Sequence, residues 1–163
     1  MEAGLVTHEF DAFFDKDSRV LILGTIPSPK SREQGFYYGH PQNRFWKVLA
    51  DVLGEGFPQT VEERKRFLKR NHIALWDVLE SCEIKGASDV SIRNARPNDM
   101  NRILQAADIR AIFATGARQR SCIKSCVFRS AEWKLFVCPL RALPTADARM
   151  RSCGRRTARF VIM

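Results

Sequence analysis

The sequence predicts one three-layer α/β/α domain, spanning residues 1–163, around a central and mainly parallel sheet of four strands. Four short apolar runs alternate with segments of helical periodicity. This alternation is typical of a parallel sheet buried between helices. A length of 163 residues with 45% hydrophobic content is enough for one core and too little for two domains.

The first half of the chain is expected to hold two strands and two helices. The apolar run 20–24 predicts the first strand, and residues 43–53 place apolar side chains at close to helical spacing. Thr60 and Glu63 match the capping-box pattern, which predicts a helix that runs to about residue 70. The run 73–77 predicts the second strand.

The second half is expected to repeat the alternation. The expected elements are a helix at 98–107 begun by Asn98 or Asp99, a strand at 109–114, a helix at 117–125 and a strand at 134–138. The carboxyl ends of the four strands would then meet at one rim of the sheet. In open α/β sheets that rim is where ligands bind.

Composition favours a basic protein that binds a polyanion. The net charge is +9 and the sequence pI is about 9.8, which indicates nucleic acid before a membrane surface. The surplus is uneven, because the last stretch of the chain sets six arginines against one acid, Asp147. These arginines are Arg141, Arg149, Arg151, Arg155, Arg156 and Arg159.

No run of the sequence is long and apolar enough for a transmembrane helix, and no secretory signal is recognisable at the N-terminus. We therefore expect a cytoplasmic protein that is not secreted. The five cysteines are odd in number and irregularly spaced, which favours free buried thiols over a disulfide framework or a metal site.

Two segments carry most of the chemistry. Gly24-Thr-Ile-Pro-Ser28 is a turn that follows the first strand, and Tyr37-Tyr-Gly-His-Pro-Gln-Asn-Arg-Phe-Trp46 leads into the first helix. Together they place backbone amides, two phenols and one carboxamide at the rim. Such a group can hold a flat polar ring and present a water molecule to it.

These two segments resemble the first motif of the uracil-DNA glycosylase superfamily. They are most similar to its hypoxanthine-DNA glycosylase (DNA-deoxyinosine glycosylase) branch, because Ile26 stands where the mismatch-specific uracil/thymine branch has Asn. The resemblance covers roughly residues 18–140. It implies a DNA glycosylase of the uracil-DNA glycosylase fold that acts on a deaminated base in duplex DNA. We expect a monofunctional enzyme, because no lysine stands inside the core motif, and a monomer that needs no cofactor and no metal.

The resemblance implies that Asn43 is the catalytic residue, which orients water toward the sugar. An Asn at this place also fits a cap for the helix that follows Pro41. The base pocket is expected to consist of Gly24, Thr25, Ile26, Pro27, Tyr37, Tyr38, His40 and Asp77. DNA phosphate contacts are expected from Ser28, Lys30, Ser31, Arg141 and Arg149.

Asp77 has two interpretations. Its carboxylate can accept a hydrogen bond from N1–H of hypoxanthine and would repel N1 of adenine. Alternatively it caps a helix that begins at Val78. His40 likewise either positions a phosphate or charge, or only bonds within its loop.

The C-terminal part departs from the family pattern. Leu140-Arg-Ala-Leu-Pro-Thr-Ala-Asp-Ala-Arg-Met150 stands where relatives carry a loop rich in Ser, Thr and Pro that presses on the minor groove. The segment 141–163 is therefore atypical, and a disordered tail is one expectation for it. Either Arg141 and Arg149 replace the lost contacts, or the enzyme is impaired. Uracil excision and a non-catalytic DNA-binding relative stay as alternatives.

Overall fold

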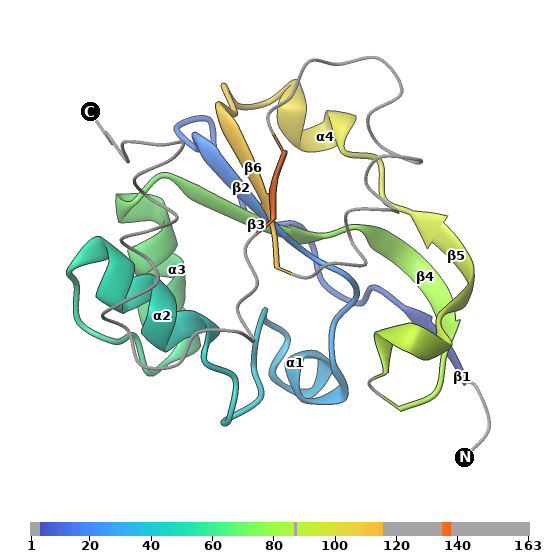
Figure 1. Cartoon of the computed structure of the whole chain (residues 1–163). Coiled ribbons are helices and arrows are strands. Elements are labelled where there is room, and N and C mark those ends of the chain that lie inside the picture. The colour runs from blue at the N-terminus through green and yellow to red at the C-terminus, as the bar shows by residue number, and fades with distance from the viewer. Residues whose placement is uncertain (1–3, 87, 116–134, 138–163) are drawn as a thin grey trace.

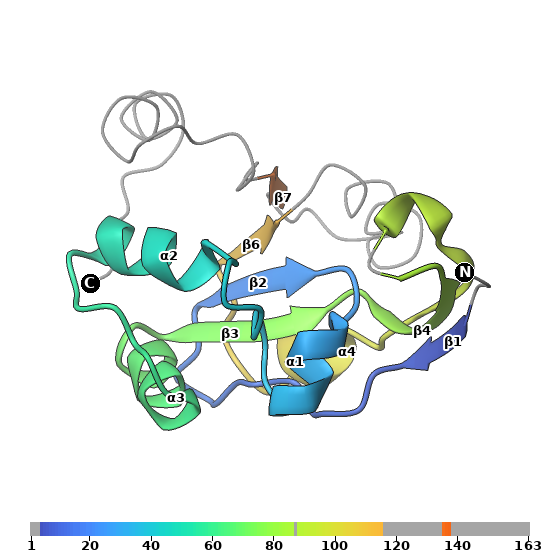
Figure 2. The same ribbon diagram turned by 90° about the horizontal axis from the view of Figure 1, so that it is seen from below.

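A computed structural model of the chain describes residues 4–86, 88–115 and 135–137, and Figure 1 shows how they are arranged. The described strands form two sheets. One is parallel with the strand order β3-β2-β6-β7, and the other is antiparallel with the order β1-β4-β5. The antiparallel sheet lies beyond the carboxyl ends of the parallel strands, on the right in both Figure 1 and Figure 2.

The parallel sheet is built on the strands that the apolar runs predict. They are β2 (Val20–Gly24), β3 (Ile73–Asp77), β6 (Ala111–Ala114) and β7 (Leu135–Val137). β2 lies between β3 and β6, and it pairs with β3 in register until Gly24 stands opposite Asp77. The turn after β2 and the carboxylate of Asp77 therefore meet at one rim.

Helices cover the parallel sheet on both sides, as predicted for an α/β fold. α1 (Pro29–Gln34) and α2 (Phe45–Leu53) lie on one side and α4 (Asn101–Leu104) on the other (Figures 1 and 2). α3 (Val61–Arg70) contacts β3. Burial between these layers explains why β2 and β3 are almost continuously apolar.

The capping box of α3 is confirmed. The Thr60 side chain accepts from the backbone N–H of Glu63 at 3.2 Å, and the Glu63 carboxylate accepts from the backbone N–H of Thr60 at 3.2 Å. Two of the orphan donors at the start of the helix are thereby satisfied. α3 packs on the core through Phe67 and Leu68, which are buried.

The second sheet was not predicted from the sequence. The antiparallel sheet consists of β1 (Gly4–Thr7), β4 (Leu79–Ile84) and β5 (Arg93–Pro97). Only Val78 separates β3 from β4, so the chain passes directly from one sheet to the other. The interpretation of Asp77 as a helix cap is wrong for the same reason, because a strand begins at Leu79.

Two other segments differ from the sequence expectation. The predicted helix 98–107 is reduced to α4, because the Asn98 side chain donates to the backbone oxygen of Asp77 at 2.9 Å instead of capping a helix. Asp99 does accept from the backbone N–H of Asn101 at 3.1 Å. α1 and the short 3-10 helix η1 (Asp89–Ser91) were not predicted. The predicted helix 117–125 lies outside the described residues.

One core joins the layers. Its largest fully buried side chains are Trp46, Phe67, Leu21, Leu23, Leu68, Leu75, Leu79, Ile103 and Ile112. Phe45 and Trp46 belong to this core, as expected from the helical pattern. The guanidinium of Arg64 lies 5.1 Å from the centre of the Trp46 ring and connects α3 to α2.

Candidate active site

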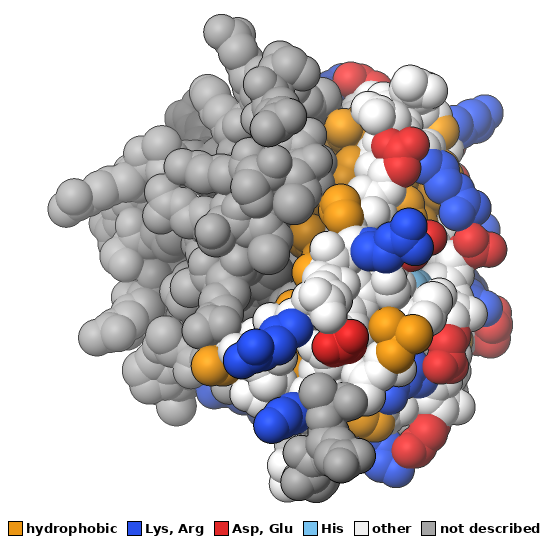
Figure 3. All heavy atoms as spheres, turned by 90° about the vertical axis from the view of Figure 1, so that its right-hand side faces the viewer, with side chains coloured by type: hydrophobic (Ala, Val, Ile, Leu, Met, Phe, Trp, Pro, Cys, Tyr) orange, Lys and Arg blue, Asp and Glu red, His pale blue; other side chains and the backbone are white. Residues whose placement is uncertain are grey.

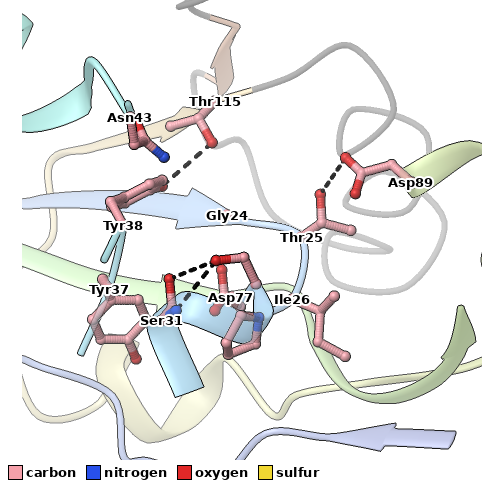
Figure 4. Close-up of a pocket in the computed structure, with 12 residues that line it drawn as sticks. Gly24, Thr25, Ile26, Ser31, Tyr37, Tyr38, Asn43, Asp77, Asp89 and Thr115 are labelled. Atoms are coloured by element: carbon pink, nitrogen blue, oxygen red, sulfur yellow. Dashed lines mark hydrogen bonds between the residues drawn. The ribbon is translucent and has the colours of Figure 1, made fainter. Parts of the chain in front are cut away.

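A pocket of about 210 Å³ opens at the carboxyl ends of β3, β2 and β6. It is lined by Gly24, Thr25, Ile26, Pro27, Ser28, Ser31, Tyr37, Tyr38, Asn43, Asp77, Asp89 and Thr115. Figure 4 shows these side chains gathered around the end of β2. Since water occupies about 30 Å³ per molecule in the liquid, the pocket has room for one planar ring system and a water.

The turn after β2 forms one wall and is held by its neighbours. The backbone oxygens of Gly24 and Thr25 accept from the N–H groups of Val78 and Leu79 at 2.9 and 3.0 Å. The pairing of β2 with β3 thus continues past the end of the sheet. Ser28 then caps α1, since its side chain accepts from the backbone N–H of Ser31 at 3.3 Å.

Asn43 lines the pocket and lies two residues before the start of α2, whose N-cap residue is Arg44. Its Oδ1 accepts from the backbone N–H of Phe45, the first residue of α2, at 2.9 Å, so the Asn43 side chain does bond to the start of this helix. The residue is nevertheless exposed, and Figure 4 shows its amide nitrogen turned toward the hydrogen bond between Tyr38 and Thr115. One carboxamide therefore fixes the loop and faces the pocket.

Tyr37 and Tyr38 both line the pocket but have different surroundings. The Tyr37 hydroxyl donates to the backbone oxygen of Asp11 at 3.1 Å. The Tyr38 hydroxyl shares a hydrogen bond of 3.3 Å with Thr115, and its ring stacks on Phe45 with centroids 3.7 Å apart. Burial raises the pKa of both phenols above the ordinary value, so both are neutral at pH 7.

Asp77 is buried in the floor of the pocket and hydrogen-bonds to a histidine. Its Oδ2 lies 3.0 Å from Nε2 of His8. Its Oδ1 lies against Gly24, where an added Cβ atom would approach to 2.1 Å. Burial raises the pKa of the Asp77 carboxyl, the hydrogen bond from His8 lowers it, and Asp89 raises it further.

Three residues at or behind the pocket were not predicted as site residues, although Thr115 was expected at the rim of the sheet. Thr115 follows β6, and Asp89 comes from η1, where it accepts from the Thr25 hydroxyl at 3.1 Å. His8 follows β1. Thr115 ends an apolar run, which is a detectable signal, whereas His8 and Asp89 reach the site only through the antiparallel sheet.

The remaining predicted site residues have other surroundings than the sequence suggests, or are not described. His40 does not line the pocket, and its Nδ1 accepts from the backbone N–H of Gln42 at 3.1 Å. Ser31 is buried, and its hydroxyl accepts from the backbone N–H of Gly39 at 3.1 Å. Lys30 is exposed and pairs with Glu33. Arg141 and Arg149 lie outside the described residues.

The model of the Uracil DNA glycosylase superfamily matches residues 12–157 of the chain. The chain belongs to this superfamily. The matched segment includes every residue that lines the pocket, whereas His8 precedes it. The fold is therefore that of the uracil DNA glycosylase superfamily, with the pocket at the carboxyl ends of its parallel strands.

Relatives of this superfamily member carry a narrower name. A hypoxanthine DNA glycosylase from Methanosarcina acetivorans is 35% identical over 98 residues, which are 60% of this chain and 62% of the relative. One from Methanosarcina barkeri is 36% identical over 93 residues, 56% of this chain and 59% of the relative. The matched part thus spans about three fifths of these relatives.

A solved structure agrees with the fold. A candidate uracil DNA glycosylase from Methanosarcina acetivorans, determined in solution by NMR, has a TM-score of 0.67 to this chain at 25% identity. The comparison covers 96% of this chain and 91% of that protein.

The charge of this superfamily member is divided between two parts of the chain. Residues 1–115 carry 16 Lys and Arg and 16 Asp and Glu, so the surplus of +9 comes entirely from residues 116–163. Figure 3 accordingly shows basic and acidic side chains interspersed on the face of the antiparallel sheet. The basic surplus from which DNA binding is predicted therefore lies in residues outside those described.

Within the described part of the chain, no group of three or more His, Cys, Asp and Glu side chains could hold a metal ion. No helix there is long and apolar enough to cross a membrane. Cys82 is a buried free thiol, and burial raises its pKa. The other four cysteines lie outside the described residues.

Proposed function

We propose that the chain is a monofunctional DNA glycosylase that hydrolyses the N-glycosidic bond of a deaminated base, hypoxanthine first. The observation that carries the proposal is that Asn43, Asp77 and the turn at Gly24 line one pocket. The superfamily membership and the names of the Methanosarcina relatives support the same reaction.

The size and position of the pocket suit a base that has left the duplex. The bond between a base and its sugar is unreachable inside the helix, so the nucleotide must be flipped into the enzyme. The ring of Tyr38, which stacks on Phe45, and the turn Gly24–Pro27 supply walls for a single heterocycle. The pocket volume of about 210 Å³ leaves space for one water molecule beside the bound base.

Asp77 would distinguish hypoxanthine from adenine. Hypoxanthine presents N1–H as a donor, and an ionised carboxylate accepts from it, while adenine presents a bare N1 that the same oxygen repels. Backbone N–H groups of the turn near Gly24–Ile26 would donate to O6. A buried polar group left unpaired by the wrong base costs about 1–3 kcal/mol, so this pair of contacts is selective.

Asn43 would orient the attacking water. The water oxygen bonds to C1′ as the C1′–N9 bond breaks with its electron pair going to the base, and the water proton ends on the departing base or solvent. The sugar passes through an oxocarbenium-like state, and an uncharged amide can hold the water without attracting the sugar cation. Positioning of this kind can contribute several kcal/mol to lowering the barrier.

No lysine lines the pocket among the described residues, which favours water over an amine as nucleophile. Ser28 and Lys30 stand at the start of α1, where they can contact phosphate, and Arg141 and Arg149 are proposed for the same role. No cofactor or metal is needed for this reaction, and the protein is proposed to act as a monomer.

The test is excision from a labelled duplex that holds one inosine, followed by alkali to break the strand at an abasic site. Duplexes with uracil, with xanthine and with ordinary bases run in parallel. Faster cleavage at inosine supports the proposal, and faster cleavage at uracil replaces it with the second candidate, which the name of the solved structure favours. Duplex binding without cleavage of any substrate would mean a non-catalytic relative.

Salt dependence of duplex binding measures the phosphate contacts. Each Lys or Arg contact with phosphate adds about −0.9 to the slope of log K against log salt. Arg141→Ala and Arg149→Ala are each expected to make the slope shallower by about 0.9, which corresponds to one lost phosphate contact. Unchanged slopes would remove these two arginines from the proposed DNA surface.

A further inference from the structure

A buried histidine stands behind the pocket and does not belong to its lining. His8 follows β1, and its backbone N–H donates to the backbone oxygen of Glu80 in β4 at 2.7 Å. The side chain points inward and is only 5% exposed. Its ring packs against Phe10 at 4.8 Å and lies 6.0 Å from Tyr37. The antiparallel sheet thus places the His8 imidazole next to Asp77, behind the pocket.

The two oxygens of Asp77 have different environments because of this imidazole. Nε2 of His8 is 3.0 Å from Oδ2, so this oxygen is already hydrogen-bonded to the imidazole. Oδ1 lies under Gly24, which itself lines the pocket. In Figure 4, Asp77 lies on the opposite side of the end of β2 from Asn43. The carboxylate therefore has a bound oxygen and a second oxygen toward the pocket.

We propose that His8 is a positioning residue for base selection, which donates Nε2–H to Asp77 and holds its second carboxylate oxygen as the acceptor for the base. The inference rests on the proposed function, because it assigns a task to Asp77 in reading the base. His8 itself touches no substrate. It acts by fixing the rotamer and the protonation state of its partner.

The balance of charge around Asp77 explains why a partner is needed. Burial raises the pKa of the Asp77 carboxyl, and the hydrogen bond and charge of His8 oppose this, while Asp89 adds to the rise. The two phenols that face the carboxyl, Tyr37 and Tyr38, are neutral and supply no positive charge. The ion pairs nearby are peripheral, namely Arg102 with Asp11 and Arg32 with Glu9.

Loss of the imidazole would therefore reverse the selection. Without His8 the buried carboxyl takes up a proton at a higher pH. A protonated Asp77 donates where it accepted before, so it no longer matches N1–H of hypoxanthine and instead matches the bare N1 of adenine. The effect depends on pH, which a loss of packing alone would not produce.

The experiment measures single-turnover excision of hypoxanthine and of adenine by the full chain across pH 5 to 9. His8→Leu removes the donor, and His8→Gln keeps an N–H donor of similar reach. For His8→Leu we expect a loss of about 10- to 100-fold on inosine at neutral pH, the range for a lost hydrogen bond to a charged group, shrinking as the pH rises. His8→Gln is expected to recover most of the rate, and Thr7→Ala, exposed on β1, to leave it unchanged.

A pH profile and a base preference that are the same in His8→Leu as in the parent would overturn the inference. The double variant His8→Leu/Asp77→Asn gives a second criterion. If His8 acts through Asp77, its substitution has no further effect once the carboxyl is gone. An equal loss in both backgrounds would show a structural role instead.

Two NMR measurements separate this inference from the proposed function. In the parent, the Nε2–H proton of His8 is expected as a slowly exchanging downfield resonance, and its absence overturns the inference without any variant. The Asp77 carboxyl carbon is expected to titrate at higher pH in His8→Leu than in the parent. The proposed function would be refuted if the parent excised no base. The histidine–carboxylate pair would still be supported if the Nε2–H resonance and the shifted titration of Asp77 in His8→Leu were both observed.

Discussion

Replacing Gly24 with alanine tests how closely the turn lies on Asp77. A Cβ atom at this position would stand 2.1 Å from Oδ1 of Asp77, whereas ordinary contacts begin at 3.4 Å, so one group must move by about 1.3 Å. A shift of that size breaks the hydrogen bond between Asp77 and His8, which is 3.0 Å long. Overpacking costs about 1–3 kcal/mol and a lost hydrogen bond to a charged group about 1.5–3 kcal/mol.

We therefore expect Gly24→Ala to lower the free energy of unfolding by about 2–5 kcal/mol. In a chain of this size each kcal/mol lowers Tm by about 2–4 °C. Urea unfolding followed by tryptophan fluorescence measures the change. Gly56→Ala is the matched control, because nothing lies within 4 Å of a Cβ atom there. It is expected to stay within about 0.5 kcal/mol of the parent.

A double-variant cycle identifies the cause of the loss. In an Asp77→Ala background the clashing oxygen is absent, so Gly24→Ala should cost less than about 1 kcal/mol. A Gly24→Ala chain as stable as the parent would refute the reasoning. So would a loss of the same size in both backgrounds, since the clash would then lie elsewhere.

Three further changes have defined outcomes. Thr60→Ala removes the cap of α3 and should lower the free energy of unfolding by about 1 kcal/mol in the same urea experiment, and no change would mean that the capping box is not formed in solution. Leu68→Ala truncates a fully buried side chain and should cost about 2–5 kcal/mol, so a loss below 1 kcal/mol would contradict its place in the core. Excision of hypoxanthine should fall as the pH drops through the pKa of Asp77, because only the ionised form accepts from N1–H. Since burial raises this pKa above the ordinary 3.8, the fall should come at a higher pH than for an exposed aspartate, and Asp77→Asn should remove that limb from the pH–rate profile.

The parallel sheet was predictable because its strands are buried on both faces. β2 and β3 appear in the sequence as short, nearly continuous apolar runs, and the polar rim follows directly at Gly24 and Asp77. The cap of α3 was predictable because the Thr60 and Glu63 contacts are local. α1 had an overlooked signal, a Ser cap followed by Pro at the first helical position.

The antiparallel sheet and its contributions to the site were not predictable in the same way. β5 is exposed at every residue and β1 at three of its four positions, so neither has a core-facing pattern. His8 and Asp77 are 69 residues apart, and Thr25 and Asp89 are 64 apart. Such pairs depend on the tertiary fold. No periodicity in the sequence relates them, and only coordinates bring them together.

The measurement that tests the central claim most directly is the single-turnover rate of hypoxanthine excision by two Asn43 variants. Asn43→Ser keeps an oxygen that can accept from the N–H of Phe45, while Asn43→Ala loses both the cap and the amide. With the duplex dissociation constant unchanged, the account predicts that both variants cut inosine about 100-fold more slowly than the parent, and that Gln42→Ala does not. A rate in Asn43→Ser equal to that of the parent would contradict the account, because Asn43 would then serve only to begin the helix.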